Sequence, residues 1–213
     1  MPFKVQVGPP QISIHQGQTI LVSESDGQIN WPSEKGLFFL DTRVVSSWAI
    51  YANGEPWELL NGGAITHYAA RIFLTNRAFE TESGTIPARM LGLTIDRWIS
   101  GGMHEDIDVT NNSMKPIRFQ LEIATRSDFA DIFEVKSNRI VRRGRIVTEW
   151  LPAQQRLHTT YRNHDFSSDD CRFAEVGRGN VCQWSAQLRS RSRTRRSLAQ
   201  LRFVYAARWQ PPS

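Results

Sequence analysis

The sequence has 213 residues, of which 40% are apolar, 10% aromatic and 22% charged, the composition of a soluble globular protein with a sizeable core. No apolar run approaches the roughly 18 residues of a membrane-spanning helix, the first residues lack the apolar core of a signal peptide, and two cysteines, Cys171 and Cys182, argue against a disulfide-framed secreted domain. The net charge of +5 does not indicate a nucleic-acid-binding body, because the excess of basic residues lies entirely in residues 176–213.

The first half of the chain reads as strands separated by short turns. Asp26-Gly27 is a hairpin-type turn signal, and Asn53-Gly54 is the strongest short-range hairpin dipeptide. A further turn is expected at Asn61-Gly62-Gly63. The strands expected between these signals cover residues 19–22, 44–51, 56–60, 64–74 and 86–99.

In the second half of the chain, polar and apolar residues alternate more strictly. Within 104–109, acids alternate with apolar residues, so Glu105 is expected on one side of a strand and Asp106 and Asp108 on the other. The acidic run could attract a cation, but we favour a solvated face. Residues 117–123 also alternate, and 156–162 form a further expected strand. Many strands with frequent turn signals indicate an antiparallel sandwich rather than βαβ units. Helix is limited to one expected turn near 127–133.

Two stretches are specific enough to indicate a family. Residues 36–43 read Gly-Leu-Phe-Phe-Leu-Asp-Thr-Arg and follow Asp26-Gly27 at a short distance. Residues 128–135 read Asp-Phe-Ala-Asp-Ile-Phe-Glu-Val and precede Arg142-Arg143-Gly144. From residue 12 to about residue 167 the chain resembles the N-terminal domain of the bacterial and archaeal glycogen debranching enzymes, the amylo-α-1,6-glucosidase family.

The resemblance implies a β-sandwich of the supersandwich type that precedes an (α/α) helical barrel, which carries the catalytic carboxylates. No catalytic residue of the family can be placed on this chain, so we expect a non-catalytic, truncated part of a glycoside hydrolase of carbohydrate metabolism. It would pack on the missing helical barrel in the cytoplasm and contact α-glucan. The alternatives are a stand-alone carbohydrate-binding or scaffold β-sandwich, and, less favoured, a nucleic-acid-binding protein. No histidine lies at metal-ligand spacing from another ligand, and we expect no cofactor.

Five charged residues are candidates for structural or interface roles. Asp41 and Arg43 directly follow an apolar run, where they would fix a corner of the sandwich or turn Arg43 toward a glucan or the partner domain. Asp128, Asp131 and Glu134 are three residues apart and would share one face of a helical turn. Glycosidases need paired carboxylates, but helix capping produces the same spacing. We favour capping.

Aromatic residues offer a second kind of candidate. Tyr51 and Trp57 could stack on sugar rings, and Trp57, in the hairpin after Asn53-Gly54, is expected to be the more exposed of the two. Packing is the favoured alternative for both, because large aromatic residues on strands are more often part of a core. Phe129 and Phe133 are expected to be core anchors.

The tail departs from this pattern. Residues 1–175 hold 18 Lys and Arg and all 21 Asp and Glu, whereas residues 176–213 hold eight Arg and no Lys or acid. We divide the chain into a β-sandwich domain, 1–167, and a divergent basic tail, 168–213. The tail is a basic arm for nucleic acid, an ordinary divergent end, or a segment read out of frame. We favour the last, because a one-nucleotide shift of the codons for 183–200 permits an alternating strand–turn–strand sequence.

Overall fold

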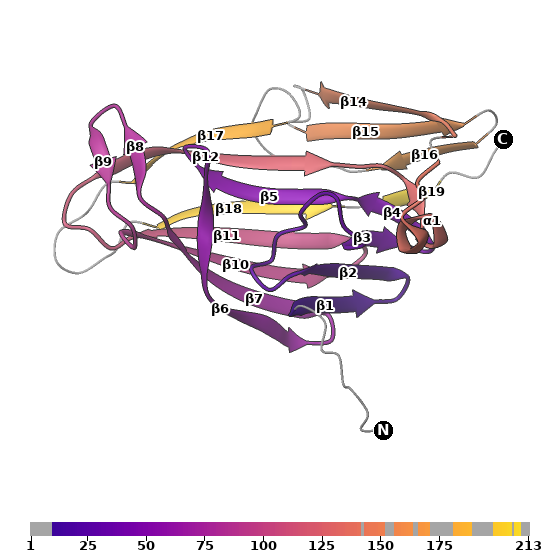
Figure 1. Cartoon of the computed structure of the whole chain (residues 1–213), viewed down its shortest axis with the longest axis horizontal. Coiled ribbons are helices and arrows are strands. Elements are labelled where there is room, and N and C mark those ends of the chain that lie inside the picture. The colour runs from indigo at the N-terminus through magenta and orange to yellow at the C-terminus, as the bar shows by residue number, and fades with distance from the viewer. Residues whose placement is uncertain are drawn as a thin grey trace, which may run out of the picture.

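The computed structural model describes residues 10–141, 143–151, 156–163, 166–170, 181–188, 198–205 and 207–209. Its regular structure is almost entirely β-strand in antiparallel pairs (Figure 1). Within the described ranges one helix occurs, α1, which covers Ile132–Ser137. The expected all-β antiparallel class is therefore confirmed.

Two sheets make up the body. The smaller has the strand order β1-β2-β3-β4-β13, with β1 Gln11–Gln16, β2 Thr19–Glu24, β3 Gly36–Phe39, β4 Thr42–Val45 and β13 Ala130–Asp131. The larger has the order β17-β12-β5-β6-β7-β10-β11-β18. Its strands are β5 Ser47–Ala52, β6 Glu55–Thr66, β7 Ala69–Asn76, β10 Leu91–Ile99, β11 Met103–Asn111, β12 Ile117–Arg126, β17 Val181–Leu188 and β18 Leu198–Tyr205.

The remaining strands form two smaller units. The first is a sheet of order β14-β15-β16-β19, and it lies along the upper side of Figure 1, near β12. The second is the hairpin β8–β9. Their bounds are β14 Arg145–Leu151, β15 Arg156–Asn163, β16 Phe166–Asp170, β19 Ala207–Trp209, β8 Phe79–Thr81 and β9 Gly84–Ile86.

The core lies between the two main sheets, and the strands reach it by simple alternation. Every second residue of β10 and β11 is buried. Leu21 and Val45 of the smaller sheet belong to the same apolar cluster as Ile95 and Ile107 of the larger sheet. Full burial of one such side chain contributes about 1.5–3 kcal/mol. Removal of apolar surface from water therefore holds the two sheets together.

One predicted turn is confirmed and one is wrong. Asn53-Gly54 joins β5 to β6 with positive φ at both residues, 49° and 79°, as a type I′ turn requires. At 61–63, by contrast, β6 continues to Thr66 and only shifts its register against β7. A Cβ at Gly62 would lie 3.1 Å from Ile72 Cγ2. The glycine therefore permits close passage of two strands and does not mark a turn.

The short helix begins later than predicted. Asp131 is its N-cap, and α1 runs from Ile132, so Asp128 lies outside the helix and the three acids do not share a helical face. Phe129 is buried, as expected of a core anchor, and stacks on Tyr161 with ring centroids 5.4 Å apart. Phe133 is 75% exposed, so the expectation of a second anchor is wrong. It lies on the solvent side of a helix whose inward residue is Val135.

Two described segments of the expected tail belong to the larger sheet. β17 pairs with β12 and β18 pairs with β11, both antiparallel. The arginine-rich run 190–196, on which the nucleic-acid alternative rests, lies outside the described residues. The reading frame of 183–200 stays a prediction. In the part of the chain described, no helix combines the length and apolarity needed to cross a membrane.

Candidate functional site

The two sequence motifs meet in space at one corner of the smaller sheet. β4 and β13 pair antiparallel, with Arg43 opposite Ala130 and Thr42 opposite Asp131. In addition, the backbone N–H of Ile132 donates to the carbonyl of Asp41 over 2.8 Å. Residues 36–43 and 128–135 are therefore distant in sequence but form a single structural unit.

Arg43 is the centre of this corner. Its side chain is fully buried, and its Nε and Nη2 donate to the two carboxylate oxygens of Asp128 over 3.2 and 2.5 Å. Its Nη1 donates to the carbonyls of Ser33 and Lys35 over 2.6 and 3.1 Å. A Cβ at Gly36 would lie 2.6 Å from Arg43 Cδ, so the glycine that opens the motif makes room for the arginine. The arrangement is a bidentate pair with further backbone partners.

The other candidate carboxylates also have structural partners. Asp131 Oδ1 accepts a hydrogen bond from the Phe133 N–H over 2.8 Å, which confirms its capping role. Glu134 pairs with Arg143, with Oε1 2.5 Å from Nη2. Asp41 is exposed at the turn between β3 and β4, where it contributes its backbone carbonyl to the corner.

Trp31 borders the corner, although the sequence patterns did not predict a role for it. It lies in the loop before β3 and is 40% exposed. The guanidinium carbons of Arg126 and Arg43 lie 4.8 and 5.5 Å from the centroid of its ring, within cation–π range. One sequence signal could have found it, because Trp31 is followed by proline and lies outside every expected strand. Strand alternation and turn signals single out only aromatic residues in strands and hairpins.

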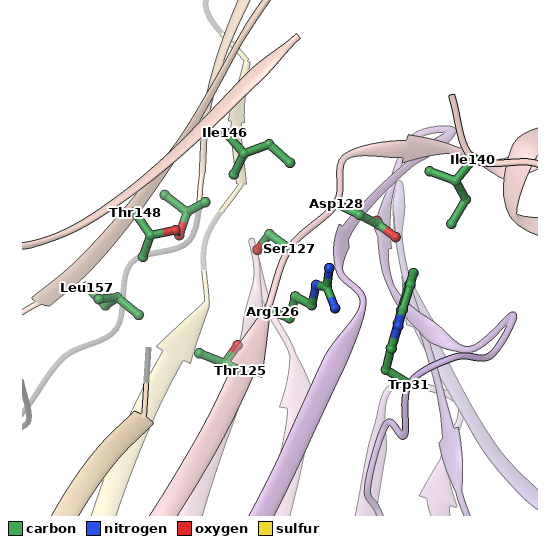
Figure 2. A pocket seen from close by; sticks show the side chains of 10 residues that line it. Trp31, Thr125, Arg126, Ser127, Asp128, Ile140, Ile146, Thr148 and Leu157 are labelled. Atoms are coloured by element: carbon green, nitrogen blue, oxygen red, sulfur yellow. The ribbon is translucent and has the colours of Figure 1, made fainter. Parts of the chain in front are cut away.

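A cavity of about 460 Å³ opens beside Trp31, a volume typical of small-molecule sites. We call it the Trp31 pocket. Figure 2 shows Trp31 on one side, the end of β12 with Arg126 and the following Asp128 behind it, and Thr148 and Leu157 opposite. The pocket therefore combines the smaller sheet's corner, the end of β12 and the sheet that contains β14 and β15.

The two aromatic residues proposed for sugar stacking lie elsewhere. Trp57 is only 6% exposed and packs edge-on against Phe119, with centroids 6.3 Å apart. The expectation that it is exposed is wrong, because the β6 alternation after the turn directs it inward. Tyr51 is half-buried on β5, next to Pro56 and Glu122 of the neighbouring strands. Neither residue lines the Trp31 pocket.

A second arginine–carboxylate pair lies inside the sandwich. Arg97 Nε donates to Glu105 Oε2 over 2.5 Å, Trp48 Nε1 donates to Glu105 Oε1 over 3.2 Å, and Arg97 Nη1 donates to the Gly27 carbonyl over 2.8 Å. Both charged side chains are buried. Burial raises the pKa of Glu105, and the Arg97 charge and the hydrogen bonds from Arg97 and Trp48 oppose this shift. Alternation predicted that Glu105 lies on the opposite face of the strand from Asp106 and Asp108, but it predicted neither the burial of Glu105 nor its partners.

The outer face of the larger sheet carries a half-exposed acidic group. Asp96 forms an ion pair with Arg71, and Asp106 and Asp108 lie on the neighbouring strand. Burial raises the pKa of Asp108, the charges of Asp96 and Asp106 raise it further, and Arg71 opposes them. Among the described residues, no group of three His, Cys, Asp or Glu could hold a metal ion.

Comparison with known families matches the chain over most of its length. The sequence model that describes the N-terminal domain of (some) glycogen debranching enzymes matches residues 14–199. The match contains both motifs of the Arg43–Asp128 corner and extends beyond residue 167, where the resemblance drawn from the motifs ends. A search of curated proteins finds no match. From the extent of the family match we conclude that the chain belongs to the family of N-terminal domains of glycogen debranching enzymes.

Proposed function

We propose that this chain is the non-catalytic N-terminal domain of a glycogen-debranching-type amylo-α-1,6-glucosidase. It docks on an (α/α) helical catalytic domain and contacts α-glucan without cleaving it. The family match over residues 14–199 carries this proposal, because an N-terminal domain implies a further part of the enzyme to which it belongs.

The contacts of the candidate carboxylates support a role without catalysis. A glycosidase needs two carboxyl groups on either side of the scissile bond, one of which donates a proton while the other acts as base or nucleophile. Asp128 instead accepts two hydrogen bonds from Arg43. Asp131 caps a helix, and Glu134 pairs with Arg143. These three acids therefore have structural roles that proton transfer would disrupt.

The β6–β7 ribbon is the surface that we propose for docking. β5 pairs with β6 only at Glu55 and Pro56, and among the described strands the rest of β6 pairs only with β7. Along this stretch Leu60 and Ile65 are each 61% exposed, and Phe73 of β7 is exposed as well. Exposed apolar side chains on an open strand edge are typical of interaction surfaces.

Co-elution tests the docking proposal. This chain and the helical catalytic domain of a glycogen debranching enzyme would be expressed together with different affinity tags and separated by size-exclusion chromatography. We expect one complex, and we expect Leu60→Glu with Ile65→Glu to separate the two proteins. Met114→Glu is the control, because Met114 is an exposed apolar residue in the connection between β11 and β12 and does not belong to the β6–β7 ribbon.

Two results would contradict the proposal. Separate elution of the wild-type proteins would favour the stand-alone carbohydrate-binding or scaffold sandwich. Release of glucose from a branched limit dextrin by the purified chain alone would show that it is itself a glycosidase.

A further inference from the structure

We infer that the Trp31 pocket is a binding site for a segment of α-glucan. This inference rests on the proposed function for the identity of the sugar, and on the pocket's own chemistry for the class of ligand. The pocket is distinct from the β6–β7 ribbon, so the protein would hold the glucan and the catalytic domain on different surfaces.

The first feature is an aromatic face held in place beside open space. Sugar rings present apolar C–H faces that pack on flat aromatic side chains, and Trp31 borders the cavity (Figure 2). Arg43, which lies over this ring, is itself fixed by its bonds to Asp128, Ser33 and Lys35. The buried arginine therefore acts as a positioning residue for Trp31. Arg126 is exposed, and its guanidinium can leave the ring to donate to a sugar hydroxyl.

The charges on the pocket wall favour a neutral ligand that both donates and accepts hydrogen bonds. Asp128 can only accept, and Arg126 can only donate. An anion would bring no hydrogen for the Asp128 carboxylate, and a cation would face the Arg126 guanidinium. A sugar hydroxyl meets both requirements because it is donor and acceptor at once.

The hydroxyl groups of the pocket complete this pattern. Thr125 lines the cavity, and its buried Oγ1 has no hydrogen-bond partner. A buried polar atom without a partner is uncommon and costs free energy. On the opposite wall, the hydroxyls of Thr148 and Thr159 lie 3.0 Å apart. One of them donates to the other, and the accepting hydroxyl keeps its own hydrogen for a ligand.

Apolar side chains fill the space between these polar groups. Ile140, Ile146 and Leu157 line the same cavity, so apolar surface alternates with the polar groups on its wall. Hexose units have this same mixture of C–H faces and hydroxyls. Within the proposed function, the sugar available to the domain is the α-linked glucose of glycogen-type chains.

Isothermal titration calorimetry of the 213-residue chain with maltoheptaose tests the inference. We expect binding by the wild type and at least about tenfold weaker binding by Trp31→Ala, which removes the stacking surface. Tyr68→Ala is the matched control: Tyr68 is 39% exposed against 40% for Trp31, but it lies in the β6–β7 turn. We expect its affinity to equal that of the wild type.

Thr125→Val separates a role in binding from a role in folding. Valine has nearly the shape of threonine but lacks the unpartnered hydroxyl, so the variant should unfold at the same or a higher urea concentration. Its affinity for maltoheptaose should fall by about fivefold, the effect of one lost hydrogen bond.

The other outcomes overturn the inference in different ways. No binding to the wild type, or equal binding by Trp31→Ala, would exclude the pocket as the site; co-elution with the helical domain would then still support docking. Equal affinity for cellohexaose would contradict the assignment to α-glucan. Displacement of maltoheptaose from the wild type by millimolar inorganic phosphate would show that the pocket prefers anions.

Discussion

Two arginine–carboxylate pairs occupy different places in this protein. Arg97–Glu105 lies in the middle of the sandwich with both side chains buried. Arg43–Asp128 lies at a corner, where the arginine is buried but Asp128 keeps 11% of its side-chain surface and lines the Trp31 pocket. The inner pair joins strands of the larger sheet to the Gly27 carbonyl after β2, so it can only stabilise the fold. In the corner pair, the Asp128 carboxylate still faces a cavity and can accept a hydrogen bond from a ligand. The two pairs therefore differ in whether a ligand can reach the carboxylate.

Breaking the Arg97–Glu105 pair should cause the largest loss of stability. Glu105→Gln leaves the Arg97 charge buried without its counter-charge, so we expect a loss of about 3–5 kcal/mol in the free energy of unfolding. Urea denaturation followed by tryptophan fluorescence measures it. The double variant Arg97→Met with Glu105→Leu is the control, because apolar replacement of a buried pair is often neutral. If Glu105→Gln were as stable as the wild type, the pair would not stabilise the fold.

The corner pair should be less costly to break. Asp128→Asn keeps the shape of the side chain and one acceptor for Arg43, and Arg43 keeps the carbonyls of Ser33 and Lys35, so we expect a loss of about 1–3 kcal/mol. The same variant should bind maltoheptaose more weakly, whereas Glu105→Gln, measured without urea at a temperature where it is folded, should bind normally. A larger stability loss for Asp128→Asn than for Glu105→Gln would reverse the comparison.

Asp131, a carboxylate of the same motif that caps a helix, gives a reference value for these stability losses. Asp131→Ala removes the N-cap of α1, and the expected loss is about 1 kcal/mol. Urea denaturation measures this loss, and Asp131→Asn, which can still accept the bond from the Phe133 N–H, should recover most of it. Equal losses for the two variants would mean that the charge of Asp131 matters rather than its hydrogen bond.

Local patterns in the sequence predicted most of the strands, although the expected strand 64–74 is divided by the turn between β6 and β7. The alternation in 104–109 was sufficient to separate Glu105 from Asp106 and Asp108, because a strand has only two faces, but the burial of Glu105 was not predicted. Patterns could not predict partners: Arg97 and Glu105 face each other across a hairpin, and Trp48 reaches Glu105 from a strand on another part of the sheet. Such contacts depend on how the sheets pack.

The candidate site was predictable only in part for the same reason. Arg43 and Asp128 were both candidates, but the sequence held no sign that they pair, since 85 positions separate them. Trp31 lies in a loop without periodicity, so alternation assigns no face to it. The spacing of Asp128, Asp131 and Glu134 indicated a helical turn, although the backbone enters the helix only after Asp131.

Substitutions in the acidic group on the outer sheet face should have the smallest effect on stability, and this effect should depend on pH. The folded state raises the pKa of Asp108 above its ordinary value of 3.8, so the folded protein binds this proton more tightly than the unfolded chain does. Stability is therefore lost as the pH rises from 3.8 through the folded pKa, and the loss is complete above it. Asp108→Asn removes the charge, so this variant should melt at a higher temperature than the wild type at about pH 7. It should show no such gain once the pH falls below the ordinary pKa of an aspartate.

Arg71→Gln should have the opposite effect near neutral pH, since Arg71 is the group that opposes the rise in the pKa of Asp108. A melting-temperature difference for Asp108→Asn that does not change with pH would mean that side-chain packing, and not charge, causes it. Unlike the two pairs above, this group combines solvent access with an excess of acids, and that is why its removal is expected to stabilise the protein.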